Sequence, residues 1–290
     1  MIPLSDDNPT LHPPFMTYAL LGAIVGTWIL VQGGGMDATR LAATVCDYGM
    51  VPGELTHGAS LGTGVPIGPD MACVVDDHAI NIVTPITSMF LHGGWMHLLG
   101  NCLFFWVFGN NVEDSMGHLR FLAFYLLCGL AAAGAHVLLD PGSPVPTVGA
   151  SGAISGVMGA YLLLYPQVRV KMLIPIVIYP LIVHMRAWIV LLWWFAVQVL
   201  SGLPQLMSLR REVSGGVAVW AHVGGFVAGV LLIRAFEDRE MVRRRRAVAD
   251  ARQVFDCRSG RTSSHYPGAP VSPTFAACIW LACSGASWRR

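Results

Sequence analysis

Residues 141–168 read PGSPVPTVGASGAISGVMGAYLLLYPQV and contain no Asp, Glu, Lys or Arg. A helix needs about 20 mostly apolar residues to span a membrane, and this stretch is long enough. Five more uncharged windows reach that length, at residues 8–36, 78–112, 121–139, 187–209 and 213–233. The sequence therefore predicts an all-α polytopic membrane protein with six transmembrane helices.

The composition excludes the ordinary soluble classes of protein. Only 12% of the 290 residues are charged, whereas 54% are hydrophobic and the mean hydropathy is +0.57. Soluble proteins carry about 25% charged residues. The net charge of +1 predicts no nucleic-acid partner. The high apolar content excludes a disordered chain, so membrane lipids are the expected surroundings.

The basic residues predict the orientation, because short cytoplasmic loops carry the excess of Lys and Arg. With both termini in the cytoplasm, the inner segments hold ten basic residues near the spans and the outer segments hold three. This orientation divides the chain into a short cytoplasmic N-terminus (1–14), a six-helix membrane domain (15–236) and a basic, disordered cytoplasmic tail (237–290).

Two connections between the predicted spans have distinct properties. The first outer loop, residues 34–77, is long and rich in Gly and Pro, and we expect it to be at least partly structured. It contains Cys46 and Cys73, which face an oxidising space in this orientation. The sequence leaves open whether they form a disulfide. The segment 172–185 is short and contains two prolines, so it is predicted to be an interfacial connector.

Polar side chains inside a membrane are costly, so each of them is a candidate for function. In the second span, His97 and Asn101 are four residues apart and share one helix face. Ser151 lies in the fourth span, and His222 is the strongly basic side chain of the sixth. At about 1.5 Å per residue from the predicted outer rims, all four lie roughly 6 to 13 Å deep. Because their depths are similar, the four side chains are predicted to lie in one layer of the membrane.

Glycine pairs explain how the fourth and sixth spans could approach each other. Gly152 and Gly156 form a GxxxG step, as do Gly225 and Gly229. Such steps let helix backbones pack closely. A serine hydroxyl becomes a good nucleophile only when a base within about 2.6–3.2 Å accepts its proton. Close packing of these two spans would therefore bring the serine and the histidine within reach of each other.

These motifs resemble those of the rhomboid family of intramembrane serine proteases. The resemblance covers residues 84–236 and rests on three patterns, namely HxxxxHxxxN at His92, His97 and Asn101, GxSG at residues 149–152, and AHxxG at residues 221–225. It implies a bacterial-type six-helix core in the inner membrane of a bacterium. It also implies single-span membrane proteins as substrates, with no cofactor and no metal.

By this resemblance, Ser151 is the nucleophile and His222 is the general base of a dyad that works through an acyl-enzyme. The resemblance assigns His97, Asn101 and Gly149 to the group that stabilises the oxyanion and the substrate. The backbone N–H of the serine is a further oxyanion donor. No Asp or Glu lies in the predicted catalytic layer. We therefore expect packing between helices to orient the histidine.

Two departures from the family pattern concern the surroundings of this dyad. Family members often have an aromatic residue four positions after the nucleophile, stacked on the histidine, but this chain has Ser155 there, which we expect to serve helix packing. The first outer loop also lacks the Trp-Arg pair of some members. Glycines within residues 204–219 suggest a movable cap between the fifth and sixth spans.

Three alternative functions can be weighed against the protease. Non-proteolytic rhomboid-like proteins would bind transmembrane helices without cutting them, but inactive relatives lose the serine or the histidine, which this chain keeps. A transporter would use His97, Asn101 and His222 as a polar pathway, yet the sequence shows no inverted repeat. A metalloprotease would need an HExxH motif, which is absent. The non-proteolytic binder is the main alternative.

Overall fold

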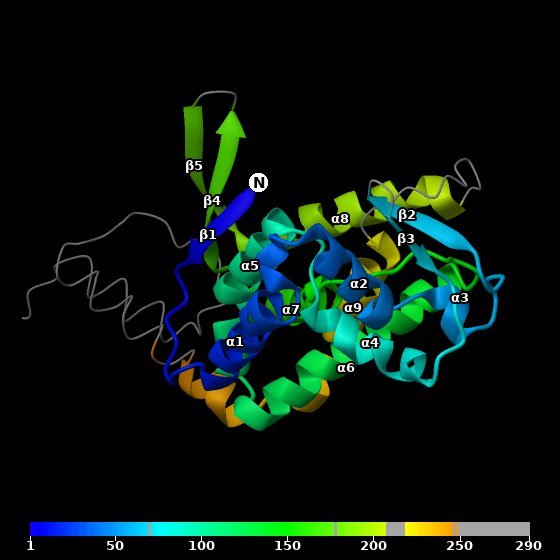
Figure 1. Ribbon diagram of the computed structural model, residues 1–290. Coiled ribbons are helices and arrows are strands. Elements are labelled where there is room, and N and C mark those ends of the chain that lie inside the picture. Colours follow the sequence, from blue (N-terminus) through cyan, green and yellow to red (C-terminus); the bar gives the residue numbers. More distant parts are fainter. Residues whose placement is uncertain (69–70, 177–178, 207–217, 246–247, 249–290) are drawn as a thin grey trace, which may run out of the picture.

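The computed structural model describes residues 1–68, 71–176, 179–206, 218–245 and 248 (Figure 1). Most of these residues are helical, as predicted. The expectation of an all-α chain is wrong in detail, because two small antiparallel sheets accompany the helices. Both sheets lie outside the helix bundle, at separate places on its surface (Figure 1).

Six helices lie at the positions of the uncharged windows: α1 (Phe15–Leu30), α5 (Trp95–Glu113), α6 (His118–Leu139), α7 (Ser151–Leu164), α8 (Ala187–Leu206) and α9 (Val219–Phe236). Of these, α6, α8 and α9 are long and apolar enough to cross a membrane, whereas α1 and α7 are apolar but have only 16 and 14 residues. Large apolar side chains on these helices are exposed, including Leu138, Leu200 and Leu231. An exposed apolar surface of this kind suits contact with lipid.

Helix α7 is the central helix of the bundle. Most of its residues are buried, and it packs against α5, α6 and α9. A helix that is apolar on all sides is suited to such a position. Its many glycine and alanine residues let the three neighbouring helices approach closely.

The predicted outer loop, residues 34–77, is structured in the part that the coordinates describe. It contains α2 (Ala38–Tyr48), α3 (Pro52–Leu55) and a hairpin of β2 (Gly64–Gly68) and β3 (Met71–Val74). A disulfide between Cys46 and Cys73 joins α2 to β3. The loop begins within η1 (Gly33–Gly35), and η2 (Ala79–Val83), α4 (Thr84–Thr87) and η3 (Ser88–Phe90) follow it.

The predicted interfacial connector forms a β-hairpin. Strands β4 (Arg169–Ile176) and β5 (Tyr179–Arg186) pair antiparallel. Strand β1 (Ile2–Asp6) adds to β4, with Ile2 opposite Leu173. The N-terminal residues therefore belong to a sheet. Apolar and β-branched side chains favour strands. However, the local sequence of β1 and β4 does not indicate that two segments about 170 residues apart will pair.

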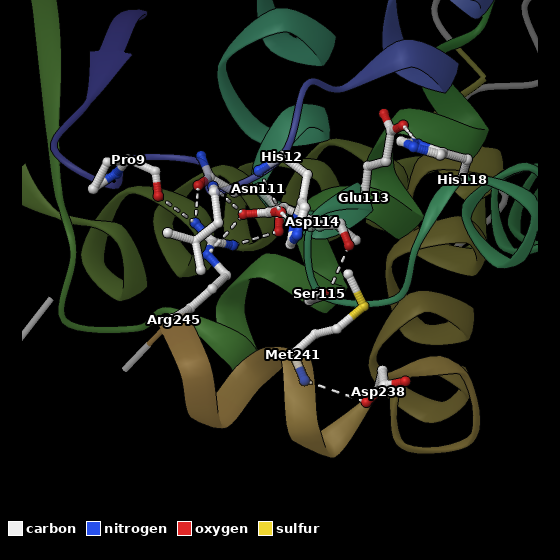
Figure 2. Close-up of polar contacts among 12 residues, drawn as sticks. Pro9, His12, Asn111, Glu113, Asp114, Ser115, His118, Asp238, Met241 and Arg245 are labelled. Carbon is white, nitrogen blue, oxygen red and sulfur yellow. Dashed lines mark hydrogen bonds and ion pairs between the residues drawn. The ribbon is translucent and has the colours of Figure 1, made fainter. Parts of the chain in front are cut away.

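A buried polar cluster surrounds Arg245, beyond the end of α9 (Figure 2). The Nε atom of Arg245 lies 3.1 Å from Oδ2 of Asp114, and both side chains are almost fully buried. The guanidinium also donates to the backbone carbonyls of Asn111, at 2.8 Å, and Pro9, at 3.0 Å. Bonds to several acceptors offset the cost of removing this charge from water.

The cluster joins three distant parts of the chain. The backbone N–H groups of Leu11 and His12 donate to the carboxylate of Asp114, at 2.7 and 3.1 Å. The N-terminal segment, the residues after α5 and the residues after α9 thus share one network (Figure 2). Residues 239–245 are helical, which differs from the disorder expected for 237–290. Residues 246–247 and 249–290 of that tail lie outside the described residues.

Arg245→Met is expected to destabilise the folded protein by about 3 kcal/mol, because the buried carboxylate of Asp114 loses its cationic partner. The measurement is thermal unfolding in a fixed detergent. Arg244→Met is the matched control, since Arg244 is exposed and pairs with the exposed Glu240, and such surface pairs contribute little. Equal melting temperatures for the two variants would contradict the role assigned to the buried arginine.

Candidate active site

Ser151 is the first residue of α7. Residues 147–150 are not helical, so the depth estimated from the helical rise does not apply before the serine. The first backbone N–H groups of a helix have no partner within that helix. The positive end of the helix dipole also favours negative charge nearby. The serine therefore lies where a developing oxyanion would be stabilised.

His222 of α9 lies beside this serine. Its Nε2 atom is 2.7 Å from the Oγ atom of Ser151, although the two residues are 71 positions apart in the sequence. His222 is only 6% exposed. A distance of about 2.6–3.2 Å allows a base to accept the proton of a hydroxyl. The pair can therefore perform general-base activation of a serine.

His97 of α5 approaches the same place at Gly149. The φ angle of Gly149 is +130°, a conformation that side chains rarely adopt. A Cβ atom on this glycine would lie 2.7 Å from Nε2 of His97 and 3.5 Å from Oγ of Ser151. The imidazole of His97 thus packs against the backbone of Gly149, which has no side chain and lies two residues before the serine. The N–H of Gly149 donates to the carbonyl of Ser88 at 2.8 Å, which holds this turn in place.

Asn101 lies one turn further along α5 than His97 and is 7% exposed. Its amide nitrogen is buried and has no hydrogen-bond partner among the described residues. A buried donor without a partner is costly, so this amide is available to an acceptor. Unlike His97, Asn101 does not line the cavity above the serine.

A cavity of about 1470 Å³ lies over the dyad. Among its lining residues are His97, Gly149, Ser151 and His222. Much of the remaining lining is apolar and comes from the outer loop, including Leu41, Val45, Val65, Ile67 and Met71. An apolar cavity with a few convergent polar groups is typical of a binding or catalytic site.

The close packing of α7 and α9 brings the two dyad residues together. A Cβ atom on Gly225 would lie 2.0 Å from the backbone oxygen of Gly152, and one on Gly229 would lie 1.9 Å from that of Gly156. Both GxxxG steps therefore lie in one interface. The two backbones are too close to admit a side chain at these positions.

Two side chains of α8 that the sequence analysis does not single out contact His222. The Nδ1 atom of His222 lies 3.0 Å from Oε1 of Gln198. The ring centroid of Trp194 lies 5.8 Å from that of the imidazole. Packing alone is therefore an incomplete account of how the histidine is oriented. The sequence feature that could have identified Gln198 is its polar side chain in an uncharged window, because polar groups are costly in a membrane.

Ser155 does not take the place of the missing aromatic residue. Its hydroxyl donates to the backbone carbonyl of Ser151 at 2.6 Å, a bond within one helix that satisfies a lone hydroxyl. The predicted movable cap, residues 204–219, falls mainly on residues 207–217, which lie outside the described residues. In the part of the chain that is described, no three His, Cys, Asp or Glu side chains are grouped to hold a metal ion.

A known protein family matches the part of the chain that contains Ser151 and His222. The sequence profile of the Rhomboid domain matches residues 81–238, more than half of the chain. The Rhomboid protease GluP of Bacillus subtilis (strain 168) is 43% identical over 77 residues, which cover 27% of this chain and 15% of that protein. The Rhomboid protease AarA of Providencia stuartii is 28% identical over 163 residues, which cover 51% of this chain and 54% of that protein.

Similar proteins also occur in plants. The RHOMBOID-like protein 5 of Arabidopsis thaliana is 36% identical over 77 residues, which cover 27% of this chain and 25% of that protein. The chain thus spans between 15% and 54% of the length of these three relatives. The family match at residues 81–238 contains His97, Gly149, Ser151 and His222 of the cavity lining.

Proposed function

The chain belongs to the rhomboid family, and on this basis we propose that it is an intramembrane serine endopeptidase. The observation that carries the proposal is the 2.7 Å hydrogen bond between Ser151 and His222. Relatives named as rhomboid proteases support it. The proposed substrates are single-span membrane proteins, cut near the outer end of the transmembrane segment.

The proposed reaction proceeds through an acyl-enzyme. His222 accepts the hydroxyl proton as Oγ of Ser151 attacks the carbonyl carbon of the scissile peptide bond. The N–H of Ser151, with His97 and Asn101, stabilises the oxyanion. His222 then donates the proton to the leaving nitrogen, so the C–N bond breaks and an ester remains. A water molecule, deprotonated by the same histidine, hydrolyses the ester and restores the serine.

The substrate must lose its helical structure before it is cut. A transmembrane helix satisfies its carbonyl groups by internal hydrogen bonds, which shield them from attack. Segments that contain Gly or Pro unwind at the lowest cost, because these two residues have the lowest helix propensities. The apolar lining of the cavity, formed in part by the disulfide-bonded outer loop, suits such an unwound segment.

We also propose six spans with both termini in the cytoplasm of a bacterium and the protein in its inner membrane. This orientation puts the Cys46–Cys73 disulfide on the oxidising side, where disulfides persist. It puts the cluster around Arg245 on the side that collects basic residues.

Reconstitution tests the proposed activity. The full chain is purified, inserted into liposomes and incubated with a single-span substrate that has Gly and Ala near the outer end of its span. The masses of the products identify the cut bond. A fluorophosphonate, which reacts with activated serines, is expected to label Ser151. Binding of several substrates with neither cleavage nor labelling would favour the non-proteolytic alternative.

Asn101→Ala is expected to lower kcat about 100-fold with little change in KM, because an oxyanion donor acts on charge that develops in the transition state. Initial rates at several substrate concentrations separate the two constants. Cys102→Ala, at the next residue of the same helix, is the control and should keep wild-type activity. A rise in KM alone would show that Asn101 binds substrate and does not stabilise the oxyanion.

A further inference from the structure

The catalytic histidine contacts a side chain on each of two helices. On one side, Nε2 of His222 meets the hydroxyl of Ser151 at 2.7 Å. On the other, Nδ1 meets Oε1 of Gln198 at 3.0 Å. Both ring nitrogens are thereby occupied, one by α7 and one by α8.

The proton of the neutral imidazole can occupy only one of these nitrogens. Activation of Ser151 requires an unprotonated Nε2, so the proton must be on Nδ1. The Nδ1–H group then donates to the side-chain oxygen of Gln198. A carboxylate performs this task in a catalytic triad, where it holds the histidine in the required tautomer and orientation.

Trp194 reinforces the contact between α8 and the histidine. It lies four residues before Gln198, so the two side chains share one face of α8. Its ring centroid is 5.8 Å from that of His222 and 6.1 Å from that of Phe226 on the same helix. This aromatic contact comes from α8, whereas family members often have an aromatic residue at the position of Ser155.

We propose that Gln198 is a positioning residue that holds His222 in the tautomer and orientation required to activate Ser151. This inference rests on the proposed protease function. Gln198 contacts the histidine at Nδ1, whereas the serine contacts it at Nε2, so Gln198 acts through the histidine and not on the substrate. The effect of its loss should therefore fall on kcat.

At this position in a span, a neutral amide costs less free energy to remove from water than a carboxylate would. A carboxylate on α8 would add a charge to a span, which is costly. The side-chain oxygen of the neutral Gln198 accepts the hydrogen bond from Nδ1–H without that cost.

Two substitutions at one position test the proposal. Gln198→Met keeps the length and volume of the side chain but removes the acceptor, and it should lower kcat about 10- to 100-fold with KM unchanged. This loss is smaller than the ~10⁴-fold effect of altering a triad carboxylate. Gln198→Glu keeps an acceptor oxygen and should retain kcat within a few-fold of wild type. A purely structural role predicts the reverse order, because a charge at this partly buried position in a span is more costly than methionine.

The readouts are kcat and KM in liposomes, the rate of fluorophosphonate labelling of Ser151, and the melting temperature. Ser201→Ala is the control for α8, because Ser201 is exposed and one turn further along the helix. Trp194→Leu should slow labelling, whereas Trp193→Leu should not, because Trp193 is 59% exposed.

The outcomes separate this inference from the function on which it rests. Wild-type kcat in a folded Gln198→Met protein would overturn the positioning role and leave the protease function intact. A Gln198→Glu protein that is folded but as slow as Gln198→Met would also overturn it, because the acceptor would then be irrelevant. Absence of both cleavage and Ser151 labelling in the wild type would overturn the proposed function, and this inference with it.

Discussion

Ser151→Ala and His222→Ala are each expected to lower substrate cleavage by about 10⁴-fold or more. Without Oγ no acyl-enzyme forms, and without the imidazole the hydroxyl keeps its proton. Because the two side chains act as one unit across the α7–α9 interface, the double variant should be no slower than either single variant.

The initial rate of cleavage in liposomes measures this effect, and thermal unfolding shows that each variant is folded. Ser155→Ala is the matched control. Ser155 lies one turn along α7, and its hydroxyl donates to a backbone carbonyl of the same helix, so its loss should change the rate by no more than a few-fold. Wild-type cleavage by a folded Ser151→Ala protein would rule out Ser151 as the nucleophile.

Gly225→Ala is expected to lower kcat about 100-fold, although a methyl group is the only addition. The new Cβ would lie 2.0 Å from the backbone oxygen of Gly152, much closer than van der Waals contact, so α9 must move away from α7. The dyad is formed between these two helices. A misplacement of about 1 Å between reacting groups costs on the order of 10²-fold in rate.

A glycine in an open position provides the control for this change. A Cβ atom on Gly134 of α6 would meet no atom within 4 Å, and alanine favours a helix, so Gly134→Ala should keep both rate and melting temperature. Gly229→Ala should lower the melting temperature, because its Cβ would lie 1.9 Å from the oxygen of Gly156. A wild-type kcat in Gly225→Ala would show that the α7–α9 distance does not control the dyad.

Much of the helical framework is predictable from hydropathy alone. Charged side chains are costly in hydrocarbon, so uncharged windows predict the positions of α6, α8 and α9. The remaining polar residues in such windows then stand out as candidates. Ser151 and His222 belong to this group, and so does Gln198, which needed the structure to reveal its partner.

Local rules also misplace some features. The predicted depth of Ser151 assumes a helical rise before this residue, but α7 begins at Ser151. The segment predicted as a connector forms part of a sheet, because β4 pairs with β1, which lies near the N-terminus and is distant in the sequence. Residues 239–245, after α9, are helical, and Arg245 is buried against Asp114. In each case, a distant segment satisfies groups that appear exposed in the local sequence.

Hydropathy and residue spacing are sufficient to identify a mostly helical membrane protein and to select the side chains proposed for catalysis, because both are properties of residues near one another in the chain. The hydrogen bonds at His222, the Cys46–Cys73 pairing and the buried Arg245 depend on the tertiary structure. Contacts of about 3 Å require two helices or loops to lie in one relative position. That position results from the packing of the whole bundle, and no single segment encodes it.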